Sequence, residues 1–153
     1  HYIRCNEFDR ALAQLLTDLS AAPSPRTPCK TLLDDTLVVV ATEFGRTPGA
    51  LNGIAGRHHY NLAYLSLYAG GGTKPGRIIG KTDAAGEHVV DTGWRYKKAS
   101  VKTENVYATI YSALGIDWTK EITNTPSKRA YRYVDILGAT EMVIDDEIAD
   151  LFV

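Results

Sequence analysis

The sequence predicts an α/β domain in which helices cover a central sheet on both faces. Residues 36–42 (TLVVVAT) are short, β-branched and apolar on both alternating sides, which is typical of an interior strand. A second strand-like run follows at residues 62–69, and apolar residues recur with helical spacing at residues 8–19 and 103–114. The length of 153 residues fits one domain over residues 1–153, or a large piece of one.

Each helix has recognisable ends. The first segment presents one apolar face, made by Phe8, Leu12, Leu15, Leu16 and Leu19. Three prolines within residues 21–30 prevent that helix from continuing, so this stretch is predicted to be an exposed connection. In the second helix we expect Thr103 to be the N-cap and Gly115 to end the helix, with a buried stripe of Val106, Ile110 and Leu114.

The connection between the two strands predicts how they pair. Residues 43–61 contain Gly, Pro, Asn and charged residues without helical periodicity, and parallel neighbours usually need a helical crossover. We therefore expect the second strand to return antiparallel, which would bring Glu43 and His59 together at one edge of the sheet. Farther along, residues 77–80 and 87–90 predict a hairpin, residues 131–134 a short strand, and residues 146–152 a final amphipathic turn.

Composition excludes several classes of partner. The 17 Lys and Arg residues nearly balance the 18 Asp and Glu residues, so a nucleic-acid partner has no support. No apolar run is long enough to span a bilayer. Cys5 and Cys29 are too few for a disulfide framework; they can pair, but two unrelated thiols are favoured. Because the chain begins at His1 without a signal peptide, we expect a truncated start.

The candidate functional residues lie in EFGRTP (residues 43–48) and GRHHYN (residues 56–61). Glu43 can ligate a metal or act as a base, and His59, less readily His58, can ligate zinc-like metals or transfer protons. Arg46 and Arg57 suit a phosphate or sulfate group. The structural alternatives stay open: Glu43 can be a strand-end carboxylate paired with an arginine, the histidines an ordinary loop pair, and the arginines tethers of a long loop.

Four successive stretches carry a further signal: DDTLVVVATEFGRTP, GRHHYN, LAYLSLYAGGGTKPGRIIGKTDAAGEHVVD and TENVYATIYSALGID. In this order they resemble domain-of-unknown-function family 1501, which is grouped with the sulfatases and alkaline phosphatases. The resemblance runs from about Phe8 to Asp117 and more loosely to the end. It implies a mixed, mostly parallel central sheet with flanking helices, as the C-terminal portion of an alkaline-phosphatase-like α/β/α sandwich.

The resemblance also implies a chemistry. The superfamily holds two divalent metals with an Asp-His pair after the equivalent strand and another His before the next strand. Glu43 stands in the place of that Asp and His59 in the place of the later His, whereas Phe44 replaces a histidine and cannot ligate. The implied metal ligands are therefore Glu43, His59 and His58, with zinc or manganese as the metal, and the implied catalytic residues are Glu43 and His59.

Two departures limit this chemistry. Relatives commonly read Gly-Arg-Asp-His-Trp where this sequence has His58 and Tyr60 in place of the Asp and the Trp. The superfamily nucleophile lies near the start of the domain, and nothing before Glu43 offers a nucleophile with its base. We therefore expect this chain to be inactive alone. The family resemblance also implies export or a periplasmic location for the intact protein.

Two functions follow as hypotheses. In the first, the complete protein is a metal-dependent hydrolase of phosphate or sulfate esters, in which Arg46 and Arg57 lie near the anion. In the second, the protein is a non-catalytic binding or assembly module, in which Glu43, Arg46 and Arg57 form a closed set of ion pairs. A truncated sheet would also expose a strand edge and an apolar face, so we expect a homo-oligomer.

Overall fold

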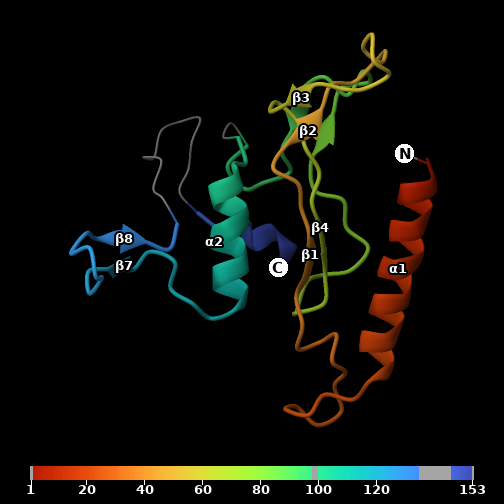
Figure 1. Cartoon of the computed structure of the whole chain (residues 1–153). Coiled ribbons are helices and arrows are strands. Elements are labelled where there is room, and N and C mark those ends of the chain that lie inside the picture. Colours follow the sequence, from red (N-terminus) through yellow and green to blue (C-terminus); the bar gives the residue numbers. More distant parts are fainter. Residues whose placement is uncertain (1, 98–99, 135–145, 153) are drawn as a thin grey trace. The chain divides into compact units, whose positions relative to one another are not determined.

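The computed structural model describes residues 2–97, 100–134 and 146–152, and the chain forms two compact units. The first unit consists of His1–Ala41 and Ser66–Pro75. The second consists of Thr42–Leu65 and Gly76–Val153, and it contains every candidate functional residue named above. Figure 1 labels most of the helices and strands of both units.

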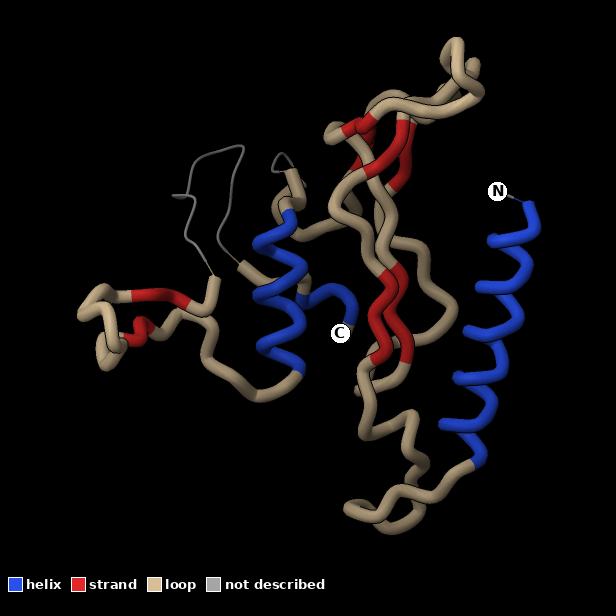
Figure 2. The backbone as a smooth tube through the Cα atoms, in the orientation of Figure 1, coloured by secondary structure: helices blue, strands red, loops and turns tan. Residues whose placement is uncertain are grey.

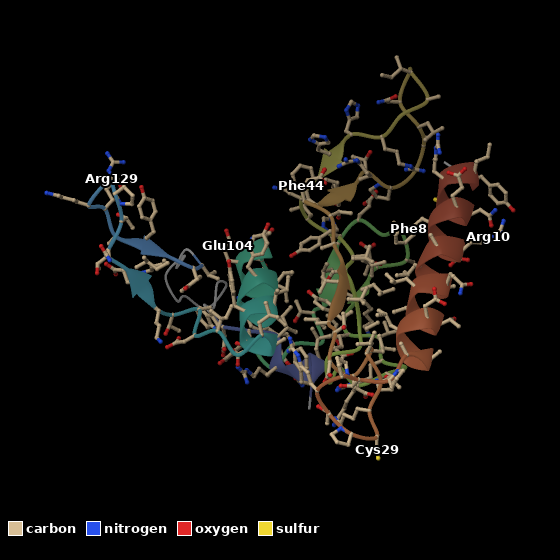
Figure 3. The ribbon with its side chains drawn as sticks, turned by 60° about the horizontal axis from the view of Figure 1, so that its bottom comes forward. Phe8, Arg10, Cys29, Phe44, Glu104 and Arg129 are labelled. Atoms are coloured by element: carbon tan, nitrogen blue, oxygen red, sulfur yellow. The ribbon has the colours of Figure 1, made fainter. Side chains whose placement is uncertain are left out.

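The first unit begins with the predicted amphipathic helix, α1 (Tyr2–Ala21). Leu12, Leu16 and Leu19 are half-buried, whereas Phe8 and Leu15 of the same apolar stripe are exposed. The proline-containing segment after α1 turns back on the helix, where the backbone N–H of residue 33 donates to the carbonyl of residue 19 at 3.1 Å. Figure 3 shows Cys29 in this turn; Cys29 and Cys5 are exposed free thiols, as predicted.

The strand pair of the first unit confirms the predicted antiparallel return. β1 (Val38–Val40) pairs with β4 (Leu67–Ala69), with Val38 opposite Ala69. The strand ends at the glycine run because the backbone turns sharply there: Gly70 has φ +71°, and a Cβ on it would lie 2.3 Å from the carbonyl oxygen of Thr36. Only glycine fits this close approach.

The prediction of a mixed, mostly parallel central sheet with flanking helices is wrong. In the described residues every strand pairs antiparallel with one other strand, which gives four separate two-stranded sheets (Figure 2). The strands are two or three residues long. Two physical causes account for the difference. In the part of the chain that the structure describes, no helix lies between the two strands of any pair, and Gly- and Pro-containing segments interrupt the chain between the short strands.

The second unit has its core around α2 (Thr103–Ala113) and the 3₁₀ helix η1 (Ala149–Leu151). Its buried apolar side chains are Trp94, Val106, Ala108, Val134 and Ile148. Two polar residues of α2, Asn105 and Thr109, are buried with them. The Thr109 hydroxyl donates to the carbonyl of Asn105 at 2.6 Å and accepts the backbone N–H of Ile148 at 2.8 Å, so it fastens the segment before η1 to α2.

The ends of α2 were predicted to within one residue. Lys102, not Thr103, is the N-cap, and its backbone N–H donates to the side-chain oxygen of Asn105 at 2.8 Å. Gly115 follows the helix with φ +71°, as predicted. Leu114 is 63% exposed, so the predicted buried stripe is wrong at that position; the buried face of α2 is shifted toward Ala108.

Two further hairpins complete the second unit. β5 (Lys81–Thr82) pairs with β6 (Val89–Asp91), a few residues later than predicted for the first strand and with an irregular register. β7 (Glu121–Ile122) pairs with β8 (Tyr131–Arg132), which confirms the short strand expected near residue 131. Among the described residues, no helix is both long and apolar enough to cross a lipid bilayer.

Candidate functional site

The candidate residues lie on one short ladder in the second unit. β2 (Gly45–Arg46) pairs antiparallel with β3 (His59–Tyr60), so that Arg46 is opposite His59 and Gly45 is opposite Tyr60. The pairing continues beyond the strands, because the N–H of Thr47 donates to the carbonyl of residue 58 at 3.0 Å. The segment from Glu43 to Thr47 and the segment from residue 57 to Tyr60 are called the β2–β3 ladder below.

Glycine is required at position 45. A Cβ there would lie 1.9 Å from the carbonyl oxygen of Ala63, closer than any side-chain carbon can approach. The backbone after β3 therefore passes directly over the middle of EFGRTP. This contact explains the glycine inside a motif that otherwise carries charged and bulky residues.

The loop that joins β2 and β3 is closed by one asparagine. The side-chain oxygen of Asn52 accepts the backbone N–H groups of Ile54 at 3.1 Å and Gly56 at 2.8 Å. The backbone N–H of Asn52 also donates to the carbonyl of Gly56 at 2.9 Å. Asn52 was not among the residues predicted to shape the site, although Asn followed by Gly is a turn signal. The closed loop fixes where Arg57 enters the ladder.

Alternation along the strands separates the candidate residues onto two faces. In an antiparallel pair, the side chains of two directly opposite residues lie on the same face. Residues two positions apart along one strand also lie on the same face. Arg46 and His59 therefore share one face, on which both are exposed. Phe44 precedes β2, and its ring lies against these two side chains. Gly45 and Tyr60 share the other face, where the Tyr60 hydroxyl donates to the carbonyl of residue 87.

The first face carries a connected group of side chains. The Phe44 ring meets the His59 imidazole edge-on, with 4.9 Å between ring centroids and an interplanar angle of 62°. The guanidinium carbon of Arg46 lies 5.9 Å from the centroid of the same ring. Figure 3 labels Phe44 beside the ladder. In the sequence Phe44 is notable only because it cannot ligate a metal, and the structure shows that its ring contacts both His59 and Arg46.

Glu43 is part of the same group. Its carboxylate accepts a hydrogen bond from Arg46 at 2.9 Å, and both side chains are about half exposed. The pKa of Glu43 is lowered, chiefly by a hydrogen bond from its own backbone N–H, then by the bond from Arg46 and by the charges of Arg46 and His59. Glu43 therefore joins the group through Arg46, which lies opposite His59 in the ladder.

Arg57 and His58 are held differently. Arg57 donates to the carbonyl oxygen of Thr47 at 2.6 Å, so the closed set of ion pairs expected for Glu43, Arg46 and Arg57 is reduced to the pair of Glu43 and Arg46. The backbone N–H of His58 donates to the Thr47 hydroxyl at 3.1 Å. Since His58 directly precedes His59 in the ladder, its side chain belongs to the opposite face.

The side chains of the ladder offer few donors for a divalent metal. Zinc sites in proteins use three or four side-chain ligands, and a Mn²⁺ site likewise needs several donors. Among the described residues there is no group of three or more His, Cys, Asp or Glu side chains that could hold a metal ion. Glu43 and His59 supply two donors, and His58 lies on the opposite face. The ladder residues therefore do not fit a metal centre by themselves.

Comparison with known proteins gives one match. The family described as Protein of unknown function (DUF1501) matches residues 1–146. The chain belongs to the DUF1501 family. The match covers the β2–β3 ladder, α2 and the segment up to residue 146, so the site described above lies within the region that this family shares. No curated protein and no solved structure matches the chain.

Proposed function

We propose that the β2–β3 ladder binds the phosphate or sulfate group of an ester, in a sulfatase-like protein of the alkaline phosphatase superfamily. The observation that carries the proposal is the register of the ladder, in which Arg46 lies opposite His59 on one exposed face. A guanidinium and an imidazole from two strands can then donate hydrogen bonds to one anion from two directions.

The ion pair of Arg46 with Glu43 leaves this face accessible to a ligand. Exposed ion pairs contribute little free energy, because water screens the charges and two side chains must be ordered. Arg46 is 45% and Glu43 55% exposed, so the pair is of this weak kind. A doubly charged anion can compete with Glu43 for the guanidinium, whose planar fork matches phosphate and sulfate oxygens.

Arg57 supports the same proposal from the loop side. The described residues give its guanidinium one hydrogen bond, to the carbonyl oxygen of Thr47, and a guanidinium carries five N–H donors. Arg57 is also exposed and lies two positions before His59. A tethered guanidinium with further donors is suited to a second contact with an anion.

The test is a titration of the chain with inorganic phosphate and inorganic sulfate by isothermal calorimetry. Arg46→Ala and His59→Ala are expected to weaken binding, by about tenfold for the arginine, since hydrogen bonds to charged groups contribute about 1.5–3 kcal/mol. His58→Ala is the matched control, because His58 is the neighbouring histidine on the opposite face, and it is expected to leave the affinity unchanged. Equal effects of the two histidine substitutions would contradict the proposal.

Hydrolysis of the bound ester is a second candidate function. It is favoured by the ladder, because Arg46 lies opposite His59 and also bonds the carboxylate of Glu43. Carboxylates and imidazoles are side chains that commonly transfer protons in enzymes. The chain can be assayed with aryl phosphates and aryl sulfates, with and without zinc or manganese. Turnover that His59→Ala abolishes would favour the hydrolase. A chain that binds phosphate but shows no turnover under either condition would leave only the binding function.

Self-association is proposed for a separate reason, the strand pair of the first unit. In the described residues β1 and β4 pair only with each other, so each keeps an outer edge without a strand partner. β1 consists of three valines without the charge or proline that usually protects an edge. An antiparallel pairing of β1 with the same strand of a second copy is self-complementary. Light scattering at high concentration tests this, and a clean monomer would contradict it.

A further inference from the structure

We propose that Phe44 is a positioning residue of the anion site, which holds the His59 imidazole and the Arg46 guanidinium on the same face of the ladder. This inference rests on the proposed function and adds to it a residue that neither binds the anion nor can ligate a metal.

The geometry of the ring carries the inference. Phe44 contacts His59 edge-on at 4.9 Å between ring centroids, and the guanidinium carbon of Arg46 lies 5.9 Å from the centroid of the phenylalanine ring. Aromatic pairs prefer such an edge-to-face arrangement, and a guanidinium within about 6 Å of a ring centroid is attracted by the ring. One half-buried side chain therefore touches both residues that are proposed to donate to the anion.

A positioning residue is needed because the two side chains proposed to bind the anion are exposed. Arg46 and His59 are both exposed, and an exposed arginine loses substantial rotamer entropy when an anion fixes it. A ring that already restricts both side chains reduces that loss before the ligand arrives. The backbone of Phe44 is itself held, because its carbonyl oxygen accepts a hydrogen bond from the Thr42 hydroxyl at 3.0 Å.

Glu43 is the other side chain that orients Arg46, and its contribution is separable from that of Phe44. The carboxylate competes with the anion for the guanidinium, since both accept its N–H donors. Phe44 contacts the guanidinium without accepting a hydrogen bond, so it can orient Arg46 in the free and in the bound state. Substitution of Phe44 is therefore expected to weaken anion binding, whereas Glu43→Gln is expected to maintain or strengthen it.

The experiment compares Phe44→Leu and Phe44→Trp in the full chain, titrated with inorganic phosphate. Leucine keeps apolar bulk without a ring and is expected to weaken affinity about two- to fivefold, the range of an exposed cation–π contact. Tryptophan keeps a ring and is expected to retain affinity. Tyr131→Leu, an exposed aromatic residue of β8, serves as the control and is expected to leave affinity unchanged.

A spectroscopic signal separates positioning from a general role in folding. The ring current of Phe44 displaces the NMR resonances of the His59 ring protons, and Phe44→Leu is expected to shift them toward random-coil positions while the Trp94 indole resonance is unchanged. Unchanged His59 resonances, equal affinity of Phe44→Leu and wild type, or equal weakening by leucine and tryptophan would each overturn the inference. A wild-type chain that binds neither phosphate nor sulfate would instead contradict the proposed function itself.

Discussion

The hydroxyl of Thr109 fastens the C-terminal segment to α2, and Thr109→Val tests how much that bond stabilises the second unit. Thr109 is fully buried, and its hydroxyl accepts the backbone N–H of Ile148 at 2.8 Å. Valine has nearly the same shape, so no large cavity forms. The substitution leaves the N–H of Ile148 buried without its acceptor, and Ile148 itself is 7% exposed.

The expected loss is about 1–3 kcal/mol in the free energy of unfolding, the cost of leaving a buried donor unsatisfied. The donated bond from Thr109 to Asn105 adds little, because that carbonyl also lies within the helical hydrogen-bond ladder of α2. For a chain of this length, each kcal/mol corresponds to about 2–4 °C in Tm. Thr109→Ser keeps the hydroxyl and loses one methyl group, so it is expected to cost about 1 kcal/mol.

Urea denaturation followed by tryptophan fluorescence measures the loss, since Trp94 is buried in the same core. Native-state hydrogen exchange shows whether the loss of stability arises at the Ile148 amide. That amide is expected to lose protection in Thr109→Val and to keep it in Thr109→Ser. Thr119→Val, in an exposed turn, is the control and is expected to change stability by less than about 0.5 kcal/mol. Equal stability of wild type and Thr109→Val would refute the reasoning.

Two further substitutions test the fold near the site and the C-terminal segment. Gly45→Ala is expected to destabilise the second unit strongly, because the new methyl group would lie 1.9 Å from a backbone carbonyl oxygen, whereas Gly53→Ala meets no atom within 4 Å and is expected to be near neutral by thermal denaturation. Burial raises the pKa of Asp146, but hydrogen bonds from Tyr96 and Arg95 outweigh that effect and the net pKa is lowered. Its contribution to stability is therefore present above the ordinary aspartate pKa and is lost as pH falls through the lowered value. Asp146→Asn is expected to reduce the acid dependence of Tm between about pH 5 and pH 2. An unchanged pH profile would count against a stabilising ion pair of Asp146 with Arg95.

The local elements could be predicted from the sequence because their signals are local. Helical spacing indicated α1 and α2, and Gly115 marked the end of the second helix at the residue where φ becomes positive. The absence of a helical crossover between residues 42 and 62 correctly predicted antiparallel pairing of β1 with β4. These inferences needed only the spacing of apolar residues and the conformational limits of glycine and proline.

The sheet could not be predicted in the same way, since its extent depends on partners far apart along the chain. The valine run of β1 is typical of an interior strand, yet in the described residues it has one neighbour. Apolar alternation shows which faces a strand can bury, but it does not say how many strands will pair with it. The mostly parallel sheet came from the family resemblance, and the short antiparallel ladders contradict it.

In the candidate site, too, the features with a local signal could be predicted and the features that depend on strand pairing could not. The pairing of the segment after Glu43 with the segment of His59 followed from the expected chain reversal, and the structure places Arg46 opposite His59. Which of the two histidines lies opposite Arg46 depends on the register of β2 with β3, which the sequence did not determine. The contacts of Phe44 with His59 and Arg46 were missed because a phenylalanine among charged residues gave no signal beyond its inability to ligate.

The central claim is that one face of the β2–β3 ladder binds a phosphate or sulfate group. Its most direct measurement is an NMR titration of the wild-type chain with inorganic sulfate, which follows the side-chain resonances of Arg46, His58 and His59 separately. The account predicts saturable shifts at Arg46 and His59 and none at His58, because only the first two share the anion-binding face. Shifts of equal size at both histidines, or no saturable shift at Arg46, would contradict it.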